Sequence, residues 1–278
     1  MKHIEGTFIG VRNLTNYYQG WVPENDTKAV ILVVHGVGEH TGRYSNLVER
    51  FVPLGYAIYG IDHIGHGRSD GEREVIERFE DYIEPLKILH KMITGWQPGK
   101  PVFIYGHSMG GLIASYLLLD HQDDYKGAIL SAAPAKIPQR ISPLTVALGK
   151  FLSRVAPKAG LLPLETSHLS HDQAVVEAYR NDPLVYHGKT PARLSAEMLR
   201  AMIRVSAEVE SISLPLFIIQ GSEDKLIDPD GSQMLYENTS STDKSIKFYE
   251  GFFHEVHNEP QRETMFKDLE IWLQSKWC

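Results

Sequence analysis

The chain has 278 residues, of which 42% are hydrophobic and 23% charged, a composition typical of soluble globular proteins. Its formal net charge of −7 argues against a nucleic-acid partner, because phosphate binding needs a basic face. The single cysteine, Cys278, excludes a disulfide framework and a cysteine-based zinc site within one chain. No apolar run is long enough to cross a membrane, and the N-terminus lacks the apolar core of a secretory signal, so we expect a cytoplasmic protein.

Segments typical of buried strands alternate with segments typical of helices. Residues 7–14 and 17–22 predict an opening antiparallel pair. Short apolar runs rich in β-branched residues, typical of strands buried on both faces, lie at 28–36, 56–62, 100–106, 127–133 and 215–221. Helices are predicted near 43–54, 79–93, 109–121, 229–238 and 260–276. This alternation predicts an α/β protein with a mostly parallel central sheet flanked by helices.

One stretch, residues 135–212, interrupts the alternation. It shows no convincing buried strand and is rich in Pro, Leu and Ala. We interpret it as a mainly helical cap inserted between two strands of the sheet. The core then consists of two parts, residues 1–134 and 213–278.

A helix is predicted near 142–156 within this cap, because Ser142 favours an N-cap and Pro143 a first helical position. An apolar stripe follows at Leu144, Leu148, Phe151, Leu152 and Val155. Residues 136–160 contain basic side chains but no acidic one. Two interpretations stay open: the stripe packs the cap against the core, or the helix makes a transient contact with an anionic membrane surface, which would make the protein peripheral to a membrane.

The sequence GHSMG, residues 106–110, lies between a predicted strand and a predicted helix. It fits the G-x-S-x-G turn, in which Ser108 Oγ stands exposed at the end of the sheet and the glycines avoid collisions in a sharp bend. A serine hydroxyl becomes a nucleophile when a base takes its proton. Strand, turn and helix in this order favour a nucleophile over an incidental serine in a glycine-rich turn.

The acid and the base are sought after the serine, because partners of this turn follow in the order Ser, acid, His. Asp224 comes first after the last buried apolar run, whereas Asp228 precedes a proline and is better explained as a helix cap. We prefer His254 to His257 as the base, since it lies nearer to the end of a strand-like segment.

Two backbone amides are expected to complete the site. The Val37 N–H follows the first buried run, and the Met109 N–H begins the helix behind the serine, so both are placed to bind a developing oxyanion. Metal chemistry is disfavoured: His63 and His66 are three apart, but neither a metal-binding helix motif nor a cysteine ligand accompanies them. We therefore expect neither a metal nor a cofactor.

Taken together, the motifs of this chain resemble those of the monoacylglycerol lipases, a family of α/β-hydrolases. The matching stretches lie between residues 35 and 259 and read HGVGEHTGRY, GIDHIGHGRSDG, GHSMGG, NDPLVY, QGSEDKLID and EGFFHEVHNE. The resemblance implies the α/β-hydrolase fold and a triad of Ser108, Asp224 and His254. It also implies Val37 and Met109 as oxyanion donors, although the family often has alanine where Val37 stands.

The resemblance further implies polar groups around the glycerol end of the pocket, at Glu39, Arg43, Tyr179 and His257. Independently of it, a carboxylate and a guanidinium four residues apart often form only a surface ion pair. The implied activity is a serine esterase that cleaves monoacylglycerols, or similar lipid esters, to fatty acid and glycerol. A lysophospholipase or broad carboxylesterase with the same triad is the alternative, and a non-catalytic relative that binds an acyl ligand is disfavoured by the intact triad.

Overall fold

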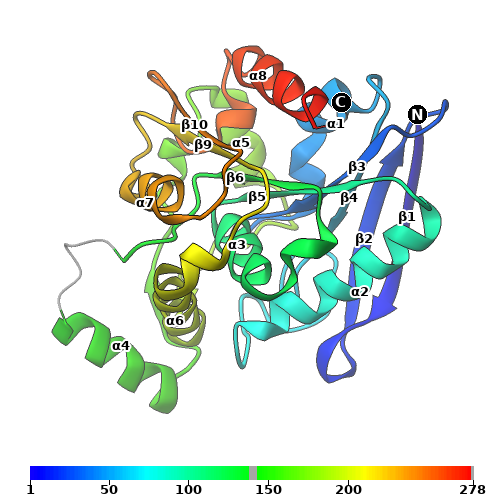
Figure 1. Cartoon of the computed structure of the whole chain (residues 1–278). Helices are drawn as coiled ribbons and strands as arrows, with labels where there is room; N and C mark the ends of the chain where they lie inside the picture. The colour runs from blue at the N-terminus through cyan, green and yellow to red at the C-terminus, as the bar shows by residue number, and fades with distance from the viewer. Residues whose placement is uncertain (138–142, 277–278) are drawn as a thin grey trace.

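A computed structural model of the chain describes residues 1–137 and 143–276. An eight-stranded sheet runs through its centre in the order β1-β2-β4-β3-β5-β6-β9-β10 (Figure 1). The strands are β1 (Lys2–Ile9), β2 (Thr15–Val22), β3 (Ala29–Val34), β4 (Tyr56–Ile61), β5 (Val102–His107), β6 (Gly127–Ser131), β9 (Leu216–Gly221) and β10 (Lys244–Tyr249). The pairings β1–β2 and β2–β4 are antiparallel and the others parallel. The predicted mostly parallel sheet with an opening antiparallel pair is confirmed.

The central strands are apolar throughout because both faces of the sheet are covered. All six residues of β3 are buried. Val30 and Leu32 face one apolar cluster, while Ile31 and Val33 face the other. Successive side chains of a strand point to opposite faces, so a strand between two helical layers needs apolar residues at every position.

Helices cover the two faces in separate layers (Figure 1). Helices α1 and α8 pack on one face, and α2, α3 and α7 on the other. These helices are α1 (Ser45–Phe51), α2 (Glu80–Trp96), α3 (Met109–His121), α7 (Asp230–Asn238) and α8 (Glu263–Gln274). Short 3-10 helices lie at Val11–Asn13, Thr41–Tyr44, Gln122–Asp124, Thr166–His168, Val209–Ser211 and Val256–Asn258.

The inserted segment is mainly helical, with α4 (Pro143–Val155), α5 (Gln173–Asn181) and α6 (Ala192–Glu208). It also contains a small antiparallel pair, β7 (Gly160–Leu162) and β8 (Thr190–Pro191). We predicted no strand there, because strands this short leave no apolar periodicity to recognise. Helix α6 buries Leu194, Ala201 and Val205 in the same apolar cluster as α3. Leu169, Tyr179 and Val185 of the inserted segment form a small separate cluster.

Helix α4 lies beside α6, at the lower left of Figure 1. It occupies nearly the predicted range, although Ser142 falls outside the described residues. Leu148, Phe151 and Val155 are 55%, 59% and 60% exposed, whereas Leu152 of the same stripe is partly buried, so packing does not cover these three side chains. No helix in the described ranges is both long and apolar enough to cross a bilayer.

Loops at the carboxyl end of the sheet carry the cap. The Glu255 amide, in the loop after β10, donates to the Leu169 carbonyl at 2.8 Å. The Tyr186 amide donates to the carbonyl of Gly38, in the loop after β3, at 2.8 Å. These backbone contacts place cap residues directly over the edge at which parallel strands end, where sites of open α/β sheets form.

Candidate active site

Ser108 occupies a strained turn between the end of β5 and the start of α3. Its φ of 54° is left-handed, which costs a non-glycine residue roughly 1–3 kcal/mol. A Cβ at Gly106 would overlap the Gly110 carbonyl, and one at Gly110 would overlap the carbonyl of Val34 on β3. Only glycine therefore lets the chain bend this sharply. The Ser108 amide donates to Ser131 O at 2.9 Å and fixes the turn to β6.

Asp224 and His254 lie together in loops that follow neighbouring strands. His254 Nδ1 donates to Asp224 Oδ2 over 2.8 Å. The same carboxylate accepts hydrogen bonds from the amides of Leu226 and Ile227 and from the Gln220 side chain. Asp224 is thus held as an acceptor with a fixed orientation, and it fixes the ring of His254 in turn.

Asp228 and His257, the alternatives considered from the sequence for the acid and the base, have other surroundings than Asp224 and His254. Asp228 Oδ1 accepts the amide of Asp230 at 3.0 Å, at the start of α7. His257 is fully buried, stacks on Tyr44 with ring centroids 4.9 Å apart, and does not line the cavity that contains Ser108. The structure therefore pairs Asp224, and not Asp228, with a histidine.

Ser108 and His254 line one small cavity beneath the cap. Its volume is ≈ 20 Å³, close to the space of one water molecule. The cavity is lined by Gly36, Val37, Glu39, His107, Ser108, Leu164, Leu169, Tyr179, His254 and Glu255. Leu164, Leu169 and Tyr179 belong to the inserted segment, so this segment covers the space beside the serine, and any ligand larger than a water molecule requires these side chains to move.

Electrostatics favour a charged histidine beside a charged aspartate. Burial lowers the pKa of His254, but the Asp224 carboxylate, together with Glu255 and Glu39, outweighs burial and raises that pKa above its ordinary value. Burial raises the pKa of Asp224, but His254 and the amides of Leu226 and Ile227 together outweigh burial and lower that pKa. Because Nδ1–H faces Asp224, the neutral ring carries its lone pair on Nε2. Burial also lowers the pKa of neighbouring His107 well below its usual range, so His107 stays neutral.

The Val37 and Met109 amides are both free to bind a ligand oxygen. Neither donates a hydrogen bond to any residue in the described ranges. Met109 is the first residue of α3, and the first amides of a helix have no partner within it. Val37 lines the cavity that contains Ser108, and Met109 directly follows Ser108 in the chain, so the oxyanion hole stays a prediction that these two amides support.

His35, a residue we did not single out, holds the loop that carries Val37. The His63 amide donates to His35 Nε2 at 2.9 Å, so the ring proton is on Nδ1, which donates to Gly36 O at 2.7 Å. Burial lowers the pKa of His35 to about 4, so the ring is neutral near pH 7. The peptide between Gly36 and Val37 is thereby fixed in one orientation.

A buried ion network joins this loop to the loop of His254. Arg43 Nη1 donates to Glu39 Oε2 at 2.7 Å and to Glu255 Oε1 at 2.6 Å, and Nη2 donates to Glu255 Oε2 at 2.8 Å. The Glu39, Arg43 and Glu255 side chains are 4%, 8% and 2% exposed, so the expected alternative of a surface ion pair is wrong. Burial opposes ionisation of Glu255, but Arg43 outweighs burial and lowers the pKa of that carboxyl.

Glu39 and Tyr179 reach the cavity, whereas Arg43 stands behind it. Glu39 Oε1 accepts the Gly36 amide at 2.6 Å and the Tyr44 hydroxyl at 2.8 Å. The guanidinium of Arg43 lies 4.5 Å from the centre of the Tyr179 ring. Both carboxylate oxygens of Glu39 accept hydrogen bonds from protein donors. Its main role in this structure is therefore to hold the loop that carries Val37.

The histidines of the DHIGHG segment pack beside the site. The rings of His63 and His66 lie 4.3 and 5.3 Å from that of His35, and all three are buried. Within residues 1–137 and 143–276, no group of three or more His, Cys, Asp or Glu side chains is arranged to hold a metal ion.

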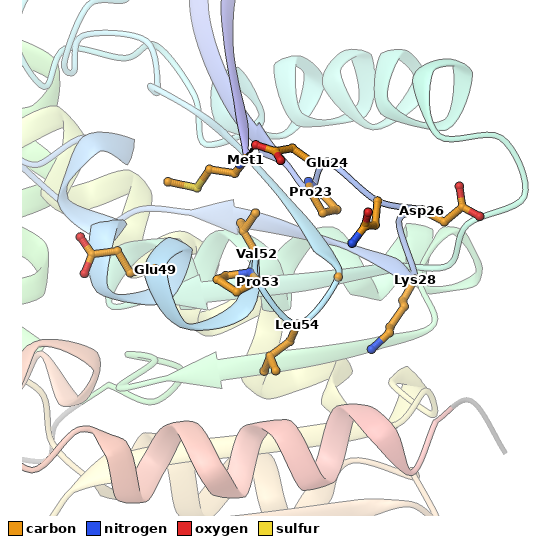
Figure 2. A pocket seen from close by; sticks show the side chains of 11 residues that line it. Met1, Pro23, Glu24, Asp26, Lys28, Glu49, Val52, Pro53 and Leu54 are labelled. Carbon is orange, nitrogen blue, oxygen red and sulfur yellow. Dashed lines mark hydrogen bonds and ion pairs between the residues drawn. The ribbon is translucent and has the colours of Figure 1, made fainter.

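A larger groove, of about 590 Å³, lies away from Ser108 (Figure 2). Its lining includes Met1, Glu24, Lys28, Glu49 and Leu54. Met1 is the N-terminal residue, Glu49 lies on α1, and the other three belong to the segments that lead into β3 and β4, at the amino ends of these parallel strands. Ser108 stands at the opposite, carboxyl edge, so this groove is not part of the candidate site.

This chain is similar to known proteins in both sequence and fold. The Hydrolase_4 family model, described as "Serine aminopeptidase, S33", matches residues 25–261. The monoacylglycerol lipase of Mycolicibacterium smegmatis is 33% identical over 271 residues, covering 98% of this chain and 97% of that protein. The chain belongs to the monoacylglycerol lipase family of α/β-hydrolases. The monoglyceride lipase of Homo sapiens is 34% identical over 260 residues, covering 92% of this chain and 86% of that protein.

A solved member of the monoacylglycerol lipase family has the same architecture. The crystal structure of the Paleococcus ferrophilus enzyme superimposes with a TM-score of 0.81 at 29% identity and covers 99% of this chain and 100% of that one. The predicted α/β-hydrolase fold is confirmed. Because one fold and one family model host several substrates, the substrate itself has to be argued from the site.

Proposed function

We propose that this chain hydrolyses the ester bond of monoacylglycerols to a fatty acid and glycerol. The strongest single observation in support is the hydrogen-bonded Asp224–His254 pair, which shares one cavity with Ser108. Membership of the monoacylglycerol lipase family supports the substrate. No metal or cofactor takes part in the proposed reaction.

The reaction proceeds through an acyl-enzyme. Ser108 Oγ attacks the ester carbonyl while His254 Nε2 takes its proton, and the Val37 and Met109 amides bind the oxyanion. His254 then gives the proton to the departing glycerol oxygen. A water molecule, deprotonated by His254, releases the fatty acid from Ser108. Asp224 remains ionised and stabilises the imidazolium.

The substrate class is tested by hydrolysis rates over a panel. The panel contains monoacylglycerols of varied chain length, a diacylglycerol, a triacylglycerol, a lysophospholipid and a simple alkyl ester. We expect the highest kcat/KM for a monoacylglycerol. A higher value for the lysophospholipid or for the simple ester would favour a lysophospholipase or a broad carboxylesterase instead, and no turnover of any ester would favour a ligand-binding relative.

Activity is expected to rise with pH and then to flatten. Attack requires neutral His254, and Asp224 raises the pKa of His254, so half-maximal kcat/KM should lie above the ordinary histidine pKa of about 6.5. The rise is measured as kcat/KM for hydrolysis of a short soluble ester at pH values between 5 and 9. A rate that falls steadily from pH 5 to 8 would point to a different base.

We further propose that α4 rests on an anionic membrane surface, from which a water-insoluble substrate arrives. The support is the exposed apolar row of Leu148, Phe151 and Val155, with exposed Arg154 beside it. Two other cations of this segment are engaged, because Lys136 pairs with Asp230 and Lys158 with Glu72. Apolar insertion therefore contributes more than charge to the proposed contact.

Loss of two apolar side chains should weaken vesicle binding. Leu148→Ser with Phe151→Ser should lower binding to phosphatidylglycerol vesicles at least about tenfold, because each buried apolar side chain stabilises by roughly 1.5–3 kcal/mol. Sedimentation measures binding, and turnover of a soluble ester should stay unchanged. The control is Ile271→Ser on α8, which removes an apolar residue that is 67% exposed but lies outside α4. Unchanged binding of the double variant, or no binding by the parent chain, contradicts the proposal.

A further inference from the structure

Glu259 is a buried carboxylate that the proposed mechanism does not use. It comes five residues after His254, at the end of the short helix Val256–Asn258, and is only 1% exposed. Burying a charged group costs free energy unless hydrogen bonds replace those it made to water. The partners of the Glu259 side chain therefore indicate what it does in this fold.

The first partner of Glu259 lies beside the base. Glu259 Oε1 accepts the amide of Phe253 at 2.8 Å, and Phe253 directly precedes His254 in the chain. The side chain thus closes residues 253–259, which we call the base loop, onto their own beginning. Because the main chain at Phe253 sets the place of the His254 ring, this hydrogen bond limits where the ring lies.

The other partners of Glu259 belong to the cap. The His171 amide donates to both oxygens of Glu259 at 3.3 Å, and His171 Nδ1 donates to Oε1 at 3.2 Å. The His171 ring also stacks on the ring of Phe253, with centroids 3.6 Å apart. One carboxylate therefore joins the base loop to the inserted segment.

Cap residues 168–171, which we call the cap strap, lie along the base loop. The Glu255 amide donates to the Leu169 carbonyl at 2.8 Å. Leu169 lines the cavity that contains Ser108 and packs in the small apolar cluster of the inserted segment. The cap strap is thus anchored in the cap, and Glu259 ties it to the loop that carries the base.

We propose that Glu259 is a positioning residue for the base of this reaction. With one oxygen on the Phe253 amide and both on the cap strap, it keeps the base loop where His254 reaches Ser108. It touches no reacting atom and acts through the main chain of the base loop. This inference rests on the proposed function, because it takes His254 to be the base.

Two substitutions separate the shape of this side chain from its charge. Glu259→Gln removes the charge but keeps an oxygen for the Phe253 amide, whereas Glu259→Asp keeps the charge but draws both oxygens back by one methylene. Glu259→Asp should lower kcat for a short soluble ester about tenfold to a hundredfold, since misplacing a reacting group by about 1 Å can cost about a hundredfold. Glu259→Gln should keep kcat within about threefold of the parent, and KM should change little in either variant.

Labelling of Ser108 by a fluorophosphonate gives a second measurement that needs no ester substrate. Its rate depends on the same base, so it should fall in Glu259→Asp and stay near the parent value in Glu259→Gln. Hydrogen exchange of residues 166–172 and 250–256, measured by mass spectrometry, should be faster in Glu259→Asp than in the parent chain.

Glu263→Asp is the matched control. Glu263 lies four residues later, pairs with Arg50 and has a side chain that is 62% exposed. The same shortening at this position should leave both rates unchanged. If thermal unfolding shows that Glu259→Asp is not folded, His171→Ala takes its place: it removes the cap side chain that contacts the carboxylate and should lower kcat about fivefold.

A folded Glu259→Asp chain with the kcat and labelling rate of the parent overturns the proposal. So does a Glu259→Gln chain that loses as much as Glu259→Asp, because that result would assign the effect to charge or to stability. The proposed function is judged separately. A parent that is labelled on Ser108 but does not prefer a monoacylglycerol contradicts the substrate alone, whereas a parent that the probe does not label overturns both.

Discussion

Ser108→Ala is expected to lower kcat by several orders of magnitude, roughly 10⁵- to 10⁶-fold by the scale of serine proteases. The proposed mechanism has no other nucleophile, since the oxyanion amides and His254 alone cannot form an acyl-enzyme. The side chain is small and makes little packing contact, so the fold should survive. Steady-state turnover of a monoacylglycerol measures the loss, and thermal unfolding shows whether the variant is native.

Two results bear on the interpretation of that loss. Near-normal turnover by a folded Ser108→Ala chain would exclude the proposed mechanism. A variant that loses both activity and its cooperative thermal transition would instead show that the hydroxyl supports the turn. The alanine is expected to keep the transition within a few degrees, because the Ser108 backbone contact to Ser131 does not involve the hydroxyl.

Asp224→Asn should lower kcat by about 10⁴-fold, the scale of the corresponding change in a serine protease. An asparagine in this place keeps the shape but removes the charge that raises the pKa of His254 and stabilises its imidazolium. The rising limb of the pH profile should therefore also move to lower pH. Both effects are measured with a soluble ester across pH 5 to 9.

Asp228→Asn is the matched control for this change. The Asp228 side chain accepts a hydrogen bond from the Asp230 amide, and an asparagine oxygen replaces that acceptor. Its kcat should stay within about threefold of the parent value. If Asp228→Asn abolishes turnover and Asp224→Asn does not, the acid has been assigned to the wrong residue.

The parts of the site that follow a strand directly could be predicted from the sequence. Ser108 comes one residue after β5 and Asp224 three residues after β9, and parallel strands deliver their carboxyl ends to a common edge. The order of the residues in the chain then favoured Asp224 as the acid and His254 as the base. The central strands were recognisable because burial on both faces forces continuous apolar runs.

Contacts between distant segments could not be predicted in this way. Arg43 and Glu255 are 212 residues apart, and no spacing rule joins them. The sequence suggested either a substrate-binding role or a surface pair for Glu39 and Arg43, because burial depends on tertiary packing that a four-residue spacing does not record. The support given by His35 depends likewise on the amide of His63, which only the folded sheet brings near.

Glu74, in the loop between β4 and α2, likewise could not be predicted: its φ of 58° is left-handed, and its Oε1 would lie 3.3 Å from a Cβ built on Gly38. A glutamate in a glycine-rich loop is normally solvent-exposed, and its sequence neighbour Glu72 is. In the folded chain Glu74 is buried and its carboxylate contacts Thr190 of the inserted segment, whereas the Glu72 side chain is half exposed.

Covalent labelling tests the central claim most directly. The parent chain is treated with a fluorophosphonate probe, which reacts with activated serines, and the modified residue is located by mass spectrometry. We expect a single adduct, on Ser108, that is slowed by a saturating monoacylglycerol and absent from Ser108→Ala. An adduct on another residue, or an active chain that the probe does not label, would contradict the assignment of Ser108 as the nucleophile of this hydrolase.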